Sequence, residues 1–255
     1  HKKAPQQGKN VAVKGDLGQS AAGKTDKNGE LTVPEVEQTE RHGVYIVGYT
    51  DGTFGPSRSM TRAEAAAIFA RLLAEKNGDT ISTAANTKFA DIPAHAWYSG
   101  YAKYLNNNGV TYGKSKTIFA PNDAITRAEF TTMAVRFFDV YGDGDAEIME
   151  QFSGFNDVSS GYWAAKYIKY AALHGWINGY GDGSFHAERE INRAEVVTIV
   201  NRLLGREADE DYIADNLRKL NTFPDVSRKH WAYYAVMEAA NAHTAVLGES
   251  ESWSK

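Results

Sequence analysis

The five-residue pattern apolar-Thr/Asn-Arg-Ala-Glu occurs three times in this chain, around Arg62, Arg127 and Arg193. These arginines repeat at a period of about 65 residues. A constant period of this kind is typical of repeated supersecondary units, each of which buries one face against its neighbours. The chain is therefore restricted to folds in which three similar units stack or close on one another.

Each copy of the pattern encodes the start of a helix. In the first copy, Thr61 and Glu64 form a capping box, in which each side chain accepts from the backbone N–H of the other residue. The same arrangement recurs in Thr126 with Glu129 and in Asn192 with Glu195. Apolar residues then follow at helical spacing, so we predict three helices with one buried face each.

The arginine at the first helical position conflicts with the helix dipole, which disfavours a cation there. Because the conflict occurs three times, it indicates a function or a specific ion pair. A guanidinium beside the unpaired N–H groups of a helix start is suited to bind a carboxylate or a phosphate. The alternative is a structural ion pair with a nearby aspartate, and the pattern leaves both interpretations open.

A second pattern, Phe-x-Asp-Ile/Val followed by tryptophan, also occurs three times. Its aspartates are Asp91, Asp157 and Asp225, and its tryptophans are Trp97, Trp163 and Trp231. We expect a short helix after each tryptophan, ended by a left-handed glycine at Gly109 and Gly175 and in another way at His243. The aspartates are expected to hold backbone at a turn. We expect the tryptophans to be partly exposed edges that line a groove, with a core position as the alternative.

Glycine-rich turns lie between the two patterns. Segments 48–54 and 179–185 both carry Asp-Gly between aromatic residues, which is a strong tight-turn signal. In the middle copy the turn is two residues longer and carries Lys114 and Lys116. Along the chain the two patterns alternate, beginning with an arginine pattern and ending with a tryptophan pattern. The first arginine pattern therefore has no tryptophan pattern before it, and the last tryptophan pattern has no arginine pattern after it. We therefore predict a closed pseudo-threefold assembly in which the two ends of the domain supply one unit together.

These patterns resemble the S-layer homology (SLH) motif, and the resemblance covers residues 43–247. It implies an all-α, mainly helical fold: a pseudo-threefold spindle with a central helix bundle and three prongs, closed by N- and C-terminal half-repeats. We expect one domain at 41–247, divided into half-repeat 41–75, repeats 88–140 and 154–205, and closing half-repeat 222–247. A polar linker or arm at 1–40 and a tail at 248–255 would flank it.

The resemblance also implies a function, which is non-covalent anchoring to secondary cell-wall polysaccharide, often pyruvylated, outside the cell. Family binding residues carry over as the three repeated arginines and tryptophans, together with Asp91, Asp157, Asp225, Gly109 and Gly175. A pyruvate ketal presents a carboxylate that suits a guanidinium, and the face of a tryptophan suits a sugar ring. The changed loop at 114–116 is a departure from the family pattern, so we expect the groove beside it to bind differently or not at all.

Composition excludes several other classes of function. The net charge is −4 and the pI is about 6.0, so the positive footprint of a nucleic-acid binder is missing. The 255 residues include no cysteine and no apolar run long enough to cross a membrane. The seven histidines show no zinc-binding spacing, so we predict neither a metal site nor a cofactor. If the protein is exported, we expect that residue 1 is not its native start, because no signal peptide is visible.

Two other functions compete with the anchor. The first is a self-assembly module, in which the aromatic surface pairs with another copy of the chain. The second is a wall-glycan hydrolase, which would need two carboxylates facing one cleft. We predict that the chain is not an enzyme, because its repeated glutamates are committed to helix caps and it contains no catalytic serine or metal motif.

Overall fold

The computed structural model describes residues 24–25, 31–32, 38–141, 154–248 and 251–254. The chain divides into two compact units, His1–Glu37 and Gln38–Lys255. In the first unit, β1 (Lys24–Thr25) pairs antiparallel with β2 (Leu31–Thr32). The rest of the predicted linker lies outside the described residues, except residues 38–40, which begin a strand of the second unit.

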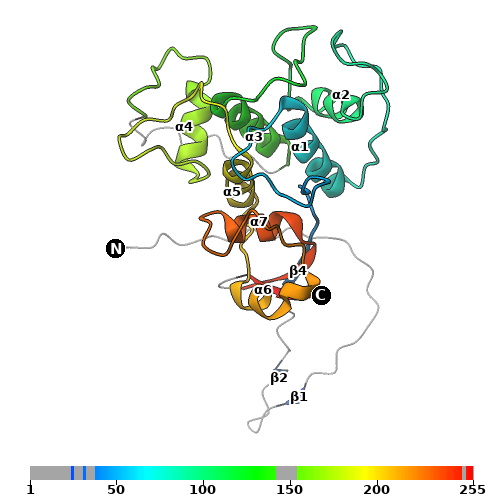
Figure 1. Ribbon diagram of the computed structural model, residues 1–255, viewed down its shortest axis with the longest axis vertical. Helices are drawn as coiled ribbons and strands as arrows, with labels where there is room; N and C mark the ends of the chain where they lie inside the picture. Colours follow the sequence, from blue (N-terminus) through cyan, green and yellow to red (C-terminus); the bar gives the residue numbers. More distant parts are fainter. Residues whose placement is uncertain (1–23, 26–30, 33–37, 142–153, 249–250, 255) are drawn as a thin grey trace. The chain divides into compact units, whose positions relative to one another are not determined.

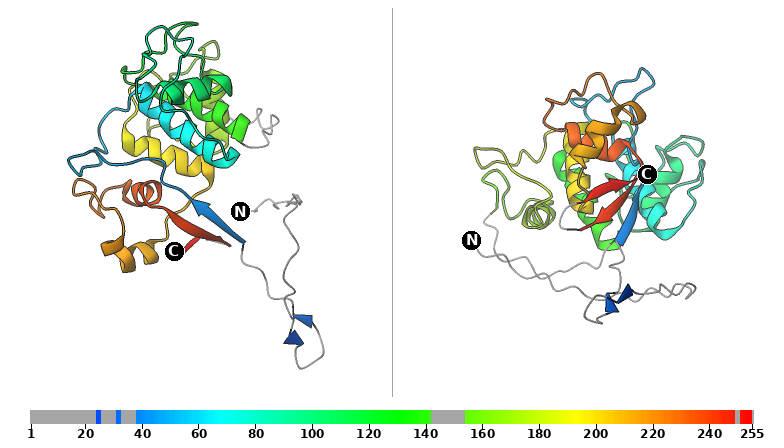
Figure 2. Two further views of the ribbon diagram at one scale, coloured as in Figure 1. Left: turned by 90° about the vertical axis from the view of Figure 1, so that its right-hand side faces the viewer. Right: turned by 90° about the horizontal axis from the view of Figure 1, so that it is seen from below.

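The second unit is mainly helical, as predicted, and also contains a small sheet (Figure 1). Its helices are α1 (Arg62–Asn77), α2 (Ser99–Asn107), α3 (Arg127–Tyr141), α4 (Ala165–Leu173), α5 (Arg193–Leu204), α6 (Glu210–Asn216), the 3-10 helix η1 (Leu217–Lys219) and α7 (Tyr233–Ala240). The antiparallel sheet has the order β3 (Gln38–His42), β4 (His243–Leu247) and β5 (Ser252–Ser254), and Figure 2 shows β3 beside β4. The predicted tail therefore contributes β5 to this sheet.

The capping residues set the beginnings of the long helices as predicted. Thr61 accepts from the Glu64 N–H at 3.2 Å, and the Glu64 carboxylate accepts from the Thr61 N–H at 2.8 Å. The equivalent bonds are present at the starts of α3 and α5. Gly78 ends α1 in the left-handed region, at φ 69°. At the end of α7, Asn241 is extended instead and leads the chain into β4, which confirms that this helix ends differently.

Three backbone hydrogen bonds close a ring just before these helices begin. The Met60 N–H donates to the Ile191 carbonyl at 3.0 Å, Ile191 donates to Ile125 at 3.1 Å, and Ile125 donates to Met60 at 2.8 Å. All three side chains are fully buried. The apolar position of the repeated pattern thus joins the starts of α1, α3 and α5 to one another.

Each long helix packs against the short helix that follows the next tryptophan pattern along the chain: α1 on α2, α3 on α4, and α5 on α7. The long helices also contact one another, because the Phe69 ring of α1 lies 5.3 Å from Phe130 and 5.0 Å from Phe137 of α3, centroid to centroid. Truncating a buried phenylalanine of this kind to alanine typically costs about 3–5 kcal/mol. None of the described helices has the length and apolarity needed to cross a membrane.

Candidate binding grooves

Three grooves of the second unit are built from equivalent residues of different repeats. Each contains an arginine of the first pattern, the capping glutamate of another repeat and an exposed tryptophan. The first groove contains Arg193, Glu64 and Trp97, the second Arg62, Glu129 and Trp163, and the third Arg127, Glu195 and Trp231. Their volumes are about 220, 510 and 210 Å³ respectively. The structure thus brings together the arginines and tryptophans that the sequence singled out.

The three guanidiniums are buried and held in the same way. In each groove Nε donates to the carbonyl of the phenylalanine that ends the glycine-rich turn. The bonds are Arg62 to Phe119 at 2.7 Å, Arg127 to Phe185 at 2.9 Å and Arg193 to Phe54 at 2.8 Å. Burial lowers the pKa of Arg127 and Arg193 below the ordinary arginine value. The side chains of Arg62 and Arg127 are 5% and 6% exposed, and all three arginines line a groove.

The ion-pair partners of these arginines are the capping glutamates and not the aspartates that we had considered. Arg62 Nη1 lies 3.1 Å from Glu129 Oε1, and Arg127 Nη1 lies 3.2 Å from Glu195 Oε1. Glu64 acts on Arg193 through its charge, while Arg193 Nη2 donates to the Val47 carbonyl at 2.6 Å. Each glutamate therefore caps its own helix and also helps to neutralise an arginine from another repeat.

The backbone N–H groups at the helix starts are not free, which corrects one expectation. The N–H groups of Arg62, Arg127 and Arg193 donate at 2.8–3.0 Å to the carbonyls of Asp123, Arg189 and Arg58. The next N–H group of each helix is also bonded to a carbonyl of another repeat, as in Ala63 to Pro121 at 2.9 Å. A ligand in these grooves would therefore contact side chains. The helix N-termini would contribute only the electrostatic field of the helix dipole, and no hydrogen bonds from these N–H groups.

A largely exposed tryptophan lines each groove. Trp97 and Trp163 are each 54% exposed, and Trp231 is 65% exposed. Tryptophan is highly buried on average, so the same exposure at three equivalent positions distinguishes these residues. Each tryptophan lies two residues before a helix start and lines its groove.

The aspartates hold backbone, but at a turn far along the chain rather than at their own. Asp91 accepts from the N–H groups of Phe119 and Ala120, at 2.9 and 2.6 Å. Asp157 binds Phe185 and His186 in the same way, and Asp225 binds Phe54 and Gly55. The last aspartate thus fixes the first turn, and the ring of Phe223 packs 5.3 Å from Phe54, so the two ends of the second unit meet here.

Gly109 and Gly175 follow α2 and α4 with φ of 77° and 72°, where a glycine is favoured. The residues that line the three grooves do not include either of them. Their assignment as ligand contacts, like that of the three aspartates, stays a prediction, while their geometry is that of structural positions.

A second set of arginines, which the sequence analysis missed, lies seven residues after each capping glutamate. These residues are Arg71, Arg136 and Arg202, and each lines one groove. Their constant spacing of nine residues from the first arginine was a visible signal in all three copies. Each groove is therefore lined by two arginines from different helices, the first arginine of one repeat and the second arginine of another.

Tyrosines separate the second groove from the other two. Tyr49 lies between two guanidiniums, 4.7 Å from Arg193 and 4.4 Å from Arg58, and Tyr180 lies similarly between Arg127 and Arg189. In the second groove Tyr112 stacks instead on Arg136 at 4.8 Å and is 53% exposed. Such cation–π contacts are worth roughly 0.5–2 kcal/mol.

The comparisons with known proteins agree with this architecture. The S-layer homology domain family matches residues 32–66, 88–131 and 154–197. The chain is 34% identical over 218 residues to "Cell surface glycoprotein 1" of Acetivibrio thermocellus, covering 82% of this chain and 9% of that protein. It is 30% identical over 233 residues to the "Cellulosome-anchoring protein" of the same organism, covering 91% and 49%.

A third relative is the "Surface-layer 125 kDa protein" of Lysinibacillus sphaericus, 32% identical over 163 residues, with 62% of this chain and 13% of that protein covered. The chain spans about half, or much less, of the length of these curated relatives. Two of these relatives are named as cell-surface or surface-layer proteins, and one is named as an anchoring protein.

Proposed function

The chain carries three S-layer homology domains, and from this premise we propose that it anchors a surface protein non-covalently to the bacterial cell wall. Its partner would be an acidic cell-wall polysaccharide, with a pyruvate ketal as the preferred acidic group, and its location would be extracellular. The names of the relatives, which refer to cell-surface, surface-layer and cellulosome-anchoring proteins, support this function.

The observation that carries the proposal is the pairing of arginines with an exposed tryptophan in each groove. Two guanidiniums suit the carboxylate of an acidic sugar, because a charge-assisted bidentate contact is about twice as strong as a neutral one. The indole face offers an apolar platform for the C–H surface of the same sugar. We assign the first and third grooves as the main sites, since each is flanked by a further arginine, Arg58 or Arg189, where the second groove has Asp123.

We further propose that the repeats form a spindle with a central helix bundle and three prongs, with the domain boundaries given above. The hydrogen-bond ring of Met60, Ile125 and Ile191 supports a pseudo-threefold axis. The contact of Asp225 with Phe54 and Gly55 supports closure by the two half-repeats.

Calorimetric titration of the chain with a pyruvylated wall-polysaccharide fragment, and with the same fragment after chemical removal of pyruvate, tests the proposal. We expect binding of the first fragment at about two sites per chain and at least roughly tenfold weaker binding of the second, because the carboxylate is lost. Equal affinity for both fragments would contradict recognition of pyruvate. No binding of either fragment, together with no sedimentation with isolated cell walls, would contradict the anchoring function.

Self-association remains an alternative, and the exposure of the three tryptophans favours it as a second candidate. Light scattering over a range of concentrations separates the two: an anchor module stays at one mass, whereas a self-assembly module grows with concentration. We consider the chain non-catalytic, because Glu64, Glu129 and Glu195 are each held by a helix N-cap. A glycoside hydrolase instead needs a free pair of carboxylates.

A further inference from the structure

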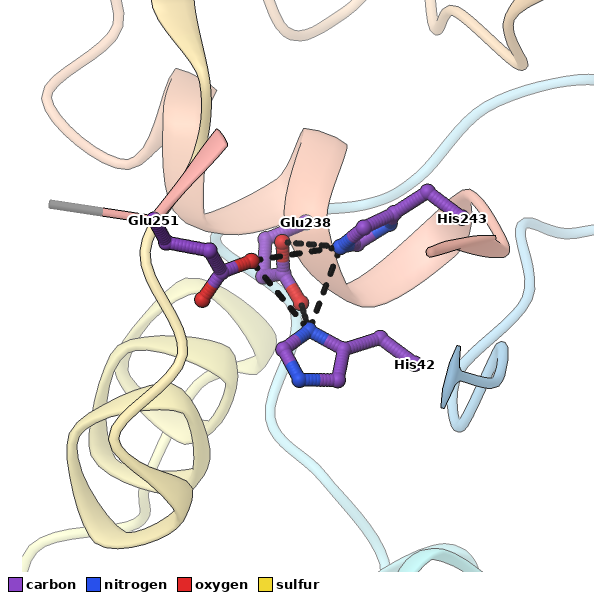
Figure 3. Close-up of side chains that lie close together, drawn as sticks. All are labelled: His42, Glu238, His243 and Glu251. Atoms are coloured by element: carbon purple, nitrogen blue, oxygen red, sulfur yellow. Dashed lines mark hydrogen bonds and ion pairs between the residues drawn. The ribbon is translucent and has the colours of Figure 1, made fainter. Parts of the chain in front are cut away.

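Four titratable side chains converge between the sheet and α7, away from the three grooves (Figure 3). His42 of β3 and His243 of β4 are direct cross-strand partners. Glu238 comes from α7, and Glu251 precedes β5. All four side chains are at most 6% exposed, so the cluster is closed to solvent.

Four nitrogen and oxygen atoms of this cluster, one from each side chain, lie within 4.8 Å of one another, close enough to surround one metal ion. His42 Nδ1 lies 3.1 Å from His243 Nε2, 3.2 Å from Glu238 Oε1 and 3.3 Å from Glu251 Oε1. His243 Nε2 lies 3.3 Å from both Glu238 Oε2 and Glu251 Oε1. Ligands about 2.0–2.1 Å from a tetrahedral ion lie about 3.3 Å from one another, which is close to the histidine–histidine and histidine–carboxylate separations.

Protons alone do not satisfy these contacts. His243 Nδ1 lies 2.9 Å from the Asn241 carbonyl, which can only accept, so Nδ1 carries the proton. In the neutral ring, Nε2 then presents its lone pair to two carboxylate oxygens. His42 Nδ1 has one hydrogen at most for three acceptors, and both oxygens of Glu238 are buried without a hydrogen bond of ordinary geometry. A buried carboxylate in this state is costly unless a cation faces it.

Surrounding residues hold the cluster in the manner expected of a metal site. The bond from His243 to the Asn241 carbonyl fixes the ring and its tautomer, as is usual for metal-binding histidines. The Trp253 ring stacks on the His243 ring at 3.7 Å, and its Nε1 donates to Glu251 Oε1 at 3.1 Å. The Glu207 N–H donates to the other oxygen of Glu251 at 2.9 Å. Both carboxylate oxygens of Glu251 are therefore oriented before any ion binds.

We propose that His42, Glu238, His243 and Glu251 form a structural site for a divalent metal ion of the zinc class. Two imidazoles and two carboxylates suit zinc, whereas calcium and magnesium prefer six or more oxygens. The charge of Arg206, which also acts on His42, opposes the ion, but two carboxylates outweigh it. The ion would join β3, at the beginning of the second unit, to the segments that follow the last repeat, in a chain that contains no cysteine for a disulfide.

The test uses the whole chain, stripped with a chelator and titrated with zinc chloride by calorimetry. We expect one zinc per chain and a melting temperature that rises with zinc but not with magnesium or calcium. Cobalt in place of zinc should give the visible absorption of a tetrahedral site, a result that requires no variant. Glu251→Gln, which keeps the shape of the side chain, should lower zinc affinity by at least roughly tenfold.

His95→Gln is the matched control, because His95 is exposed and lies outside the cluster. It should leave the affinity and stoichiometry unchanged. The proposal is overturned if the stripped chain takes up no zinc and its melting temperature does not respond to it. It is equally overturned if Glu251→Gln binds zinc as well as the unaltered chain, or if cobalt gives an octahedral spectrum.

Discussion

The second groove and the other two are built on the same scaffold but carry different charges. The first groove sets Arg58, Arg71 and Arg193 against Glu64, and the third sets Arg127, Arg189 and Arg202 against Glu195. The second sets Arg62, Lys114 and Arg136 against Glu129, Glu188 and Asp123. When the flanking residue Arg58, Asp123 or Arg189 is included, the first and third grooves have an excess of positive charge and the second has none.

Two local changes account for this difference. Asp123 stands where the other repeats have Arg58 and Arg189, and the longer turn supplies Lys114, whose Nζ pairs with Asp123 Oδ2 at 2.9 Å. Tyr112 has no arginine on its outer face and instead contacts Arg136. The second groove is also more than twice as large as each of the others. The buried contact between the arginine and the turn carbonyl is unchanged. The repeat can therefore alter its binding surface while keeping its fold.

The largest expected effect comes from removing the exposed indoles. The double variant Trp97→Ala, Trp231→Ala should weaken binding of the wall polysaccharide by more than ~100-fold, since each central aromatic contact is worth about 2 kcal/mol. Binding to isolated cell walls and calorimetry with the acidic fragment measure this. Because these side chains are more than half exposed, the melting temperature should change little.

Trp163→Ala is the matched control in the second groove, with the same exposure as Trp97. It should change the affinity by less than about threefold, because that groove lacks the charge excess. If Trp163→Ala weakened binding as much as the double variant, the distinction between the grooves would be lost. The repeated arginines are less suitable probes, because removing them leaves turn carbonyls unpaired and destabilises the fold.

Exchanging one charge between grooves should have a smaller effect, of roughly tenfold. Arg58→Asp makes the first groove resemble the second and should weaken binding, and the loss should shrink at high salt as exposed charges are screened. Asp123→Arg, the reverse change, should strengthen binding by the second groove and raise the stoichiometry measured by calorimetry. An unchanged affinity in both variants would show that these charges do not select the ligand.

A comparison of turn residues predicts a stability change of about 1 kcal/mol. Ala120 occupies the left-handed region at φ 57°, where the first repeat has Gly55 at φ 67°. Ala120→Gly should therefore raise the free energy of unfolding by roughly 0.5–1 kcal/mol in urea denaturation.

Gly55→Ala should have the opposite sign, with a loss of at least about 1 kcal/mol. Its Cβ would lie 2.7 Å from Arg58 Cδ and 2.8 Å from Tyr49 Cε2, and so it would also disturb the first groove. If this variant kept both its stability and its affinity, the stack of Arg58 on Tyr49 would not matter.

The smallest expected effect is on the pH dependence of the unfolding free energy, through the aspartates that hold the turns of the first and third grooves. Burial acts to raise the pKa of Asp157 and Asp225, but the backbone N–H groups that they accept from bring it below the ordinary value. Their contribution is therefore present above the unfolded-state pKa of about 3.9 and is lost as the pH falls through the lower folded-state value. Unfolding free energies measured from pH 7 down to acid should fall less steeply in Asp225→Asn than in the unaltered chain.

Features encoded by neighbouring residues could be predicted from the sequence. The capping boxes, the left-handed glycines and the helices depend on side chains three or four positions apart, and all are found where the repeats placed them. The exposed position of Trp97 and its counterparts followed from their place before a helix start. The partners of Arg62 and Asp91 could not be predicted in this way, because they come from other repeats and depend on how the three units close.

The small sheet and its histidine cluster show the same limit more clearly. His42 and His243 are 201 residues apart, and only the register of β3 on β4 brings their rings together. A search for zinc-binding spacing examines short segments, so it cannot detect ligands joined in this way. Arg71, Arg136 and Arg202 are a different case, since their regular spacing was visible in the sequence.

The most direct test of the central claim is a crystal structure of the chain with an acidic wall-polysaccharide fragment bound. We expect fragments in the first and third grooves, with the carboxylate facing Arg193 or Arg127 and a sugar ring on Trp97 or Trp231. A fragment bound in the second groove alone, or on a surface away from all three arginines, would contradict it.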